Sequence, residues 1–174
     1  LLACEALCQI PSDLPVEITI NAIPREGTPD VILSRAASLG RLWQFEMGRL
    51  LTHPELNRFD AIGVYLTGSK ISDFRLTLDL LHQDNRPLLF CGFNGVVLEK
   101  FMEGMSWRLG YDVICISGPR DRDTLDRMVA GTPFDQQTKI VTGLRRNSTA
   151  NLELLPHNER PKRLTFAEQV VMPS

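Results

Sequence analysis

The feature of this sequence that most limits its fold is a regular alternation of short apolar runs with helical segments from residue 59 onward. The apolar runs cover residues 60–66, 86–91, 111–116 and 139–141, and the helical segments cover 72–82, 96–109 and 120–129. Each apolar run suits a strand that is buried on both faces. Strands that alternate with helices form a parallel sheet with right-handed crossovers, and 174 residues are too few for an eight-unit barrel. We therefore expect an α/β fold with a Rossmann-like, doubly wound parallel sheet.

The residues before 59 predict further helices and one further strand of the same α/β fold. Residues 1–10 are apolar at nearly every position and stop at Pro11, which is typical of the end of a buried helix. Residues 16–20 alternate as a strand, and residues 31–39 and 41–51 have the spacing of helices. No predicted strand precedes the first helix, although the first strand of a doubly wound sheet is central. We therefore expect an N-terminal strand to be missing and the sheet to be incomplete.

The C-terminal part differs in composition from the rest. Residues 145–163 combine basic side chains with Asn, Ser, Thr and two prolines, which is typical of a linker. One more strand is predicted at 164–168, near the end of the sequence. We therefore predict an N-terminal Rossmann-like domain over 1–144, a linker over 145–163, and the start of a truncated second domain over 164–174. Both ends should need stabilisation from outside this sequence, and the fragment alone should dimerise or aggregate.

Charge and composition exclude several classes of function. The 19 Lys and Arg residues against 21 Asp and Glu leave a net charge of −2, which disfavours a nucleic-acid partner. No apolar run approaches the roughly 18 residues that span a bilayer. The four cysteines have no Cys-x-x-Cys spacing and three lie in apolar stretches, which is typical of reduced thiols in a cytoplasmic protein. The three histidines are far apart, so we expect no metal site.

Three short loops carry the candidate substrate-binding residues, because each follows a predicted strand. The carboxyl ends of parallel strands meet at one edge of the sheet, where ligands bind beside helix N-termini. These loops offer hydroxyls, backbone amides, an ammonium and a guanidinium, which suit a phosphate or a sugar hydroxyl. The residues are Thr67, Gly68, Ser69 and Lys70 in the first loop, Gly92, Phe93, Asn94 and Gly95 in the second, and Ser117, Gly118 and Arg120 in the third.

Each of these residues also has a purely structural interpretation, because small residues are needed in any tight turn between strand and helix. Glu99, in the first turn of the helix after the second loop, is either a general base or hydroxyl ligand, or a solvated helical charge. Arg120 either faces an anion or belongs to a solvated first turn. Neither Gly-x-Gly-x-x-Gly after a strand nor a P-loop motif is present, so a classical dinucleotide enzyme and a P-loop enzyme are not supported. No catalytic base follows from the pattern.

The order of these parts resembles that of GT-B glycosyltransferases. The resemblance rests on the loop 92–95 before a long helix, on a strand ending at Ser117 before a charged helix, and on the stretch Ile140-Val141-Thr142-Gly143-Leu144-Arg145-Arg146 before the proline-rich linker. It covers about residues 15–170. The sequence is similar to an actinobacterial family of putative glycosyltransferases and, more distantly, to the CDP-glycerol glycerophosphotransferases of wall and capsule synthesis.

The resemblance implies that the chain is most of the N-terminal, acceptor-side domain of a two-domain, metal-independent transferase. Such an enzyme moves a glycosyl or related phospho-group from a nucleotide-sugar donor to a glycan or lipid-linked acceptor, in surface polysaccharide or glycolipid synthesis. The nucleotide site would lie in the missing second domain, so we expect no cofactor here and an inactive fragment. Peripheral membrane association and a homodimer are compatible with this role. The alternative is a non-catalytic Rossmann-like binding or regulatory module.

Overall fold

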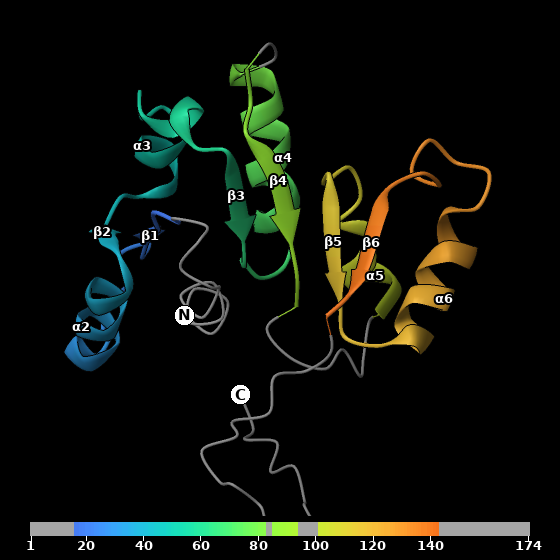
Figure 1. Cartoon of the computed structure of the whole chain (residues 1–174), viewed down its shortest axis with the longest axis horizontal. Helices are drawn as coiled ribbons and strands as arrows, with labels where there is room; N and C mark the ends of the chain where they lie inside the picture. The colour runs from blue at the N-terminus through green and yellow to red at the C-terminus, as the bar shows by residue number, and fades with distance from the viewer. Residues whose placement is uncertain (1–15, 83–84, 94–100, 143–174) are drawn as a thin grey trace, which may run out of the picture.

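The computed structural model describes residues 16–82, 85–93 and 101–142, which form a Rossmann-like α/β structure with two parallel sheets (Figure 1). The smaller sheet pairs β1 (Thr19–Asn21) with β2 (Arg41–Trp43), and the chain between them forms α2 (Asp30–Leu39). The helix α3 (Met47–Leu51) and the 3-10 helix η1 (Leu56–Arg58) lead to the larger sheet. Its elements follow in the order β3 (Ala61–Val64), α4 (Lys70–Leu81), β4 (Leu88–Cys91), α5 (Phe101–Ser106), β5 (Val113–Ile116), α6 (Pro119–Val129) and β6 (Thr138–Val141). The predicted fold class is confirmed.

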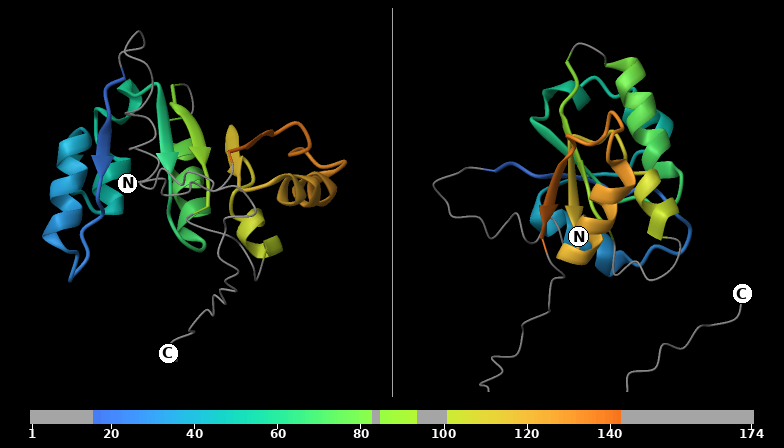
Figure 2. Two further views of the ribbon diagram at one scale, coloured as in Figure 1. Left: turned by 60° about the horizontal axis from the view of Figure 1, so that its bottom comes forward. Right: turned by 90° about the vertical axis from the view of Figure 1, so that its right-hand side faces the viewer.

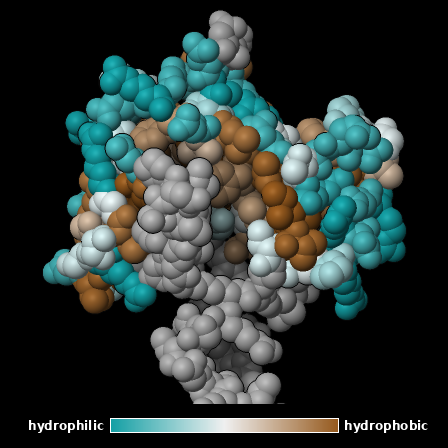
Figure 3. Space-filling view, viewed as in Figure 1, coloured by the Kyte–Doolittle hydropathy of each residue, from teal (hydrophilic) through white to brown (hydrophobic). Residues whose placement is uncertain are grey.

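The larger sheet is built in chain order, β3-β4-β5-β6, and every neighbouring pair is parallel. Right-handed crossovers that step in one direction put their helices on one face, and α4, α5 and α6 share a face (Figure 2, right). Leu89 and Ile116 point towards the helices and are fully buried. Leu88 and Ile140 lie on the opposite face and are about half exposed. Apolar side chains therefore gather on that face over β4 and β5 (Figure 3).

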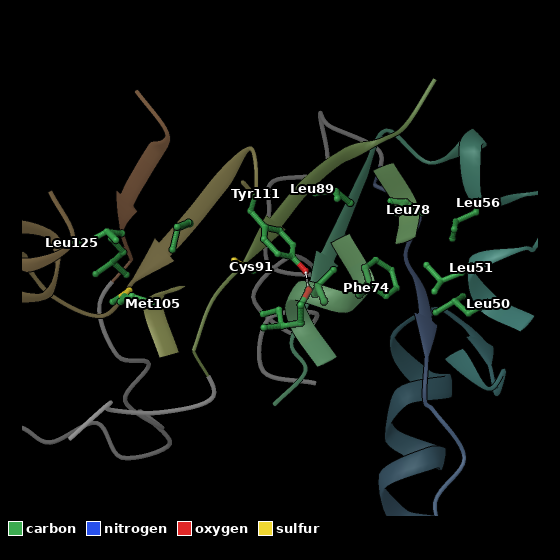
Figure 4. Packing of buried hydrophobic residues seen from close by; sticks show 14 of the residues in the cluster. Leu50, Leu51, Leu56, Phe74, Leu78, Leu89, Cys91, Met105, Tyr111 and Leu125 are labelled. Carbon is green, nitrogen blue, oxygen red and sulfur yellow. Dashed lines mark hydrogen bonds between the residues drawn. The ribbon is translucent and has the colours of Figure 1, made fainter. Parts of the chain in front are cut away.

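The hydrophobic core of the described residues lies between the larger sheet and its helices and extends to Leu50, Leu51 and Leu56 before β3 (Figure 4). Leu78, Leu89 and Leu125 come from α4, β4 and α6, and each is 0% exposed. Tyr111, just before β5, is also buried, and its hydroxyl donates a hydrogen bond of 2.6 Å to the main-chain oxygen of Ile71. This bond ties the first turn of α4 to the chain that enters β5.

The segment 41–51 differs from its prediction as one helix, because its first residues form β2 and only α3 is helical. The apolar residues of this segment fit a helical period, but pairing with β1 decides its structure. The Arg41 N–H donates to the oxygen of Ile18 at 2.9 Å. The Asn21 side chain donates to the Phe45 oxygen at 3.1 Å and accepts from the Phe45 N–H at 2.9 Å. The side chain of Asn21 thus continues the hydrogen bonding between β1 and β2 beyond Trp43, the last residue of β2.

The other predicted elements agree with the structure to within three residues wherever it describes them. The described part of the predicted helix 96–109 is α5, and the residues after it form turns. The predicted helix 1–10, the linker 145–163 and the strand 164–168 lie outside the described residues. No helix in the described part of the chain is long and apolar enough to cross a membrane.

Charged side chains form a network at the amino edge of the larger sheet. Arg86, before β4, makes two hydrogen bonds of 2.5 and 2.8 Å to the carboxylate of Asp112, before β5. Asp112 also accepts the N–H of Leu89 at 2.7 Å. Arg86 reaches Asp79 on α4 at 2.9 Å, and Asp79 pairs with Arg75 at 2.6 Å. The network joins α4 to the entries of β4 and β5.

Candidate functional site

The order of the strands in space reverses between β1 and β3. From β1 the chain moves away from β3 to form β2, and from β3 it moves in the opposite direction to form β4, β5 and β6. The arrows of β1, β3 and β4 point the same way (Figure 2, left). In open α/β sheets, ligands bind beyond the carboxyl ends of the strands where the strand order changes direction. The candidate site therefore lies at the carboxyl ends of β1 and β3 and of the strands beside them.

A cleft of about 220 Å³ lies between these two strands. The residues that line it include Thr19, Asn21 and Ile23 on one side and Ala61, Gly63 and Tyr65 on the other. Sequence reasoning did not single out Asn21, Ile23 or Tyr65. The signal was available, because each lies at or just after the end of a predicted strand.

The loop after β3 keeps its predicted residues at the start of α4. Gly68 has a φ of 61°, a left-handed conformation that favours glycine, and no described residue lies within 4 Å of the place a Cβ would take. Ser69 is the N-cap of α4 but makes no side-chain capping bond. Thr67 and Lys70 are exposed, and Lys70 is the first helical residue. An uncapped helix N-terminus and an ammonium thus share an exposed turn, which suits an anion.

The described start of the loop after β4, Gly92 and Phe93, is packed rather than open. Gly92 is buried, and a Cβ there would lie 3.0 Å from the Tyr65 ring and 3.4 Å from the Cβ of Cys115. Arg108 is 6% exposed and donates to the Gly92 oxygen at 3.1 Å. Its guanidinium lies 3.9 Å from the centre of the Phe93 ring. Burial lowers the pKa of Arg108, and the aromatic face stabilises its charge. Phe93 therefore packs on a buried arginine at this edge, and its predicted part in substrate binding stays a prediction.

The loop after β5 is open in the same way as the loop after β3. Gly118 is the N-cap of α6, its backbone is extended, and the part of the chain that the structure describes places no atom within 4 Å of a Cβ there. Pro119 is the first helical residue, and Arg120 after it is exposed. Ser117 is half-buried at the end of β5. A second helix N-terminus without a side-chain cap thus lies beside a cation at the same edge.

The structure brings together part of the predicted site. The ends of β3, β4 and β5 meet at Gly92, which lies between Tyr65 and Cys115, and the two open loops belong to the outer two of these strands. Asn94, Gly95 and Glu99 lie outside the described residues, so their roles stay predictions.

The chemistry of the two open loops is that of binding. Residues 65–70 and 117–120 contain hydroxyls and two cations, but no carboxylate, imidazole or thiol. Such a set can hold a phosphate or a sugar hydroxyl, but it does not provide a general base. Within residues 16–82, 85–93 and 101–142, no group of three His, Cys, Asp or Glu side chains is placed to hold a metal ion.

Cys91 should resist alkylation as long as the protein is folded. Its thiol is fully buried, and burial raises its pKa to about 12. Because the thiolate is the nucleophile, we expect no reaction with iodoacetamide at about pH 8 until denaturant is added. Burial raises the pKa of Cys115 too, but this side chain is partly exposed and should react first. Peptide mass spectrometry measures both rates, and equal rates in the folded protein would contradict this prediction.

A family described as "Putative glycosyltransferase (DUF6716)" matches residues 3–174. The matched range therefore includes both the sheets and the predicted linker region. No curated protein and no solved structure matches the chain.

Proposed function

We propose that this chain, which belongs to the DUF6716 family of putative glycosyltransferases, is the acceptor-side domain of a GT-B-type transferase. The family supports a glycosyltransferase-like role. The observation that carries the finer proposal is the change of strand direction between β1 and β3, with uncapped N-termini of α4 and α6 at the same sheet edge. Such an edge is where parallel α/β domains bind ligands.

The proposed reaction takes place in the cytoplasm and moves a glycosyl or related phospho-group from a nucleotide-activated donor to a glycan or lipid-linked acceptor. The acceptor hydroxyl attacks the transferred group, and the bond to the nucleotide phosphate breaks. A second domain binds the nucleotide, as in CDP-glycerol glycerophosphotransferases, and needs no metal. Here Lys70 and Arg120 offer positive charge to an acceptor phosphate, and Thr67 and Ser69 offer hydroxyls to a sugar.

Replacing Arg120 by alanine in the full-length protein should lower kcat/KM for the acceptor about tenfold, because a charge-assisted hydrogen bond contributes about 1.5 kcal/mol. Arg122 is the matched control, because it lies on the same helix and pairs with Asp126 at 3.7 Å. Both arginines are exposed, so neither change should move the melting temperature appreciably. Transfer of a radiolabelled sugar to the acceptor measures the effect. Equal losses in Arg120→Ala and Arg122→Ala would contradict the assignment.

A second candidate is a non-catalytic Rossmann-like binding or regulatory module, which the absence of acidic and basic catalysts from the two open loops favours. Nucleotide release separates the two candidates. The full-length protein should release nucleotide from one of a panel of uridine-, guanosine- and cytidine-activated donors, with or without EDTA. Binding of a glycan without turnover of any donor would favour the module.

A further inference from the structure

We infer that the cleft between β1 and β3 is the seat of one more β-strand, parallel to both and supplied by this polypeptide ahead of residue 1. This inference concerns the edges of the two strands and holds whichever reaction the protein performs. The added strand would join the smaller sheet to the larger one.

The backbone of β1 uses only alternate residues to pair with β2. Ile18 and Ala22 each make a hydrogen bond of 2.9 Å to that strand. In a parallel ladder the residues that alternate with these direct their N–H and C=O groups to the other side. These residues are Thr19, Asn21 and Ile23, and all three line the cleft. β1 therefore presents an open edge to the cleft.

The backbone of β3 likewise uses alternate residues to pair with β4, and it borders the cleft on the side opposite β1. Asp60 accepts a hydrogen bond of 3.1 Å from the N–H of Leu88, at the start of β4. Alternation then directs the N–H and C=O groups of Ala61 and Gly63 away from β4, and both residues line the cleft. In the sheets formed by the described residues, β1 and β3 are both end strands. Two parallel edges that no described strand pairs with thus face one cleft.

A strand is the occupant that pairs with both edges at once. Main-chain N–H and C=O groups that leave water need partners, and an open edge is a template for another strand. The cleft is also lined by apolar side chains, including Trp43, Leu50, Phe59 and Phe74. The added strand should therefore be apolar on both faces, as central strands of parallel sheets are.

Chain order points to a segment ahead of residue 1. With that strand in the cleft, the order becomes β2-β1-added strand-β3-β4-β5-β6. If the added strand comes first in the chain, every later strand except β3 lies beside the strand that precedes it in the sequence. Parallel neighbours need a connection of a dozen or more residues, and 18 residues precede Thr19. A strand from beyond β6 would have to cross the whole larger sheet.

The added strand also changes the candidate site. Its carboxyl end would fall between Ile23 and Tyr65, at the point where the strand order changes direction. The loop that follows it would then contribute residues to the site between the ends of β1 and β3.

Amide hydrogen exchange tests the inference on the unmodified protein, expressed from its natural start codon. The N–H groups of Ile20, Ile62 and Val64 pair within the described sheets and provide the internal reference. We expect the N–H groups of Asn21 and Gly63 to exchange as slowly as these. An alternating pattern, with Asn21 and Gly63 fast and their neighbours slow, would show an unfilled cleft and overturn the inference.

Cross-linking identifies the source of the strand. Met47 lines the cleft, and photo-methionine replaces methionine with little change of shape. A mixture of ¹⁴N- and ¹⁵N-labelled protein distinguishes links within one molecule from links between two. We expect Met47 to link to a peptide ahead of residue 1 in the same molecule. Links to a second copy, or to residues 1–15 or 143–174, would assign the cleft to another occupant and overturn the inference.

Discussion

Replacing Gly40 by alanine should lower the free energy of unfolding by about 3 kcal/mol, the upper end of the usual cost of overpacking. A Cβ at this position would lie 2.2 Å from the main-chain oxygen of Ile18. That oxygen is held in place, because it accepts the N–H of Arg41 where β1 and β2 begin to pair. The added methyl group must therefore push the two strands apart. Urea unfolding followed by circular dichroism measures the loss.

Gly118→Ala is the matched control for Gly40→Ala. Both glycines have an extended backbone that any residue adopts, with φ of −162° at Gly118 and 170° at Gly40. Among the described residues, none lies within 4 Å of a Cβ at Gly118. We expect this control to change stability by about 0.5 kcal/mol or less. Similar losses in both variants would show that contact with Ile18 is not the cause.

Replacing Asp112 by asparagine should lower stability by about 2 kcal/mol near neutral pH, the range for hydrogen bonds to charged groups. The carboxylate accepts two hydrogen bonds from Arg86 and one from the Leu89 N–H. The bonds from Arg86 are the main cause that lowers the pKa of Asp112, and they outweigh burial, which raises it. The amide can keep the Leu89 bond, but it leaves the Arg86 charge without this counter-charge.

The difference between Asp112→Asn and the wild type should shrink in acid. A carboxylate with a lowered pKa stabilises the folded state above its unfolded-state pKa of about 3.9, and this contribution is lost as the pH falls through the folded-state pKa. Urea unfolding should show a large difference in the free energy of unfolding between the two proteins at about pH 7 and a small one at about pH 2.5. Glu55→Gln is the control, because Glu55 pairs with Arg41 on the surface and its loss should be too small to resolve. A difference independent of pH would contradict the role of this ion pair.

The strands of the larger sheet could be predicted because their signal is local. Leu89 and Ile114 belong to short apolar runs bounded by turn residues, and this pattern is visible in one sequence. β2 could not be predicted in this way. Leu42 and Phe45 fit a helix as well as a strand, and the choice depends on pairing with residues about 20 positions earlier, which leaves no local signal.

The positions of the candidate loops were predictable for the same reason. Loops at strand ends can be located once the strands are known, and Lys70 and Arg120 do follow β3 and β5 in the structure. Their part in binding stays a prediction. Whether such a loop is open or packed depends on tertiary contacts. The stacking of Phe93 on Arg108 joins a loop to the end of another helical segment, and only the structure shows it.

The chain order of the larger sheet also determines how it can form. Each strand from β4 to β6 pairs with the strand about 25 residues before it. Because each new strand adds to its predecessor in the chain, the larger sheet can grow strand by strand while the chain is still being synthesised. The smaller sheet emerges first, but it has no main-chain bonds to β3 among the described residues. Its docking across the cleft is therefore the step of folding most exposed to error.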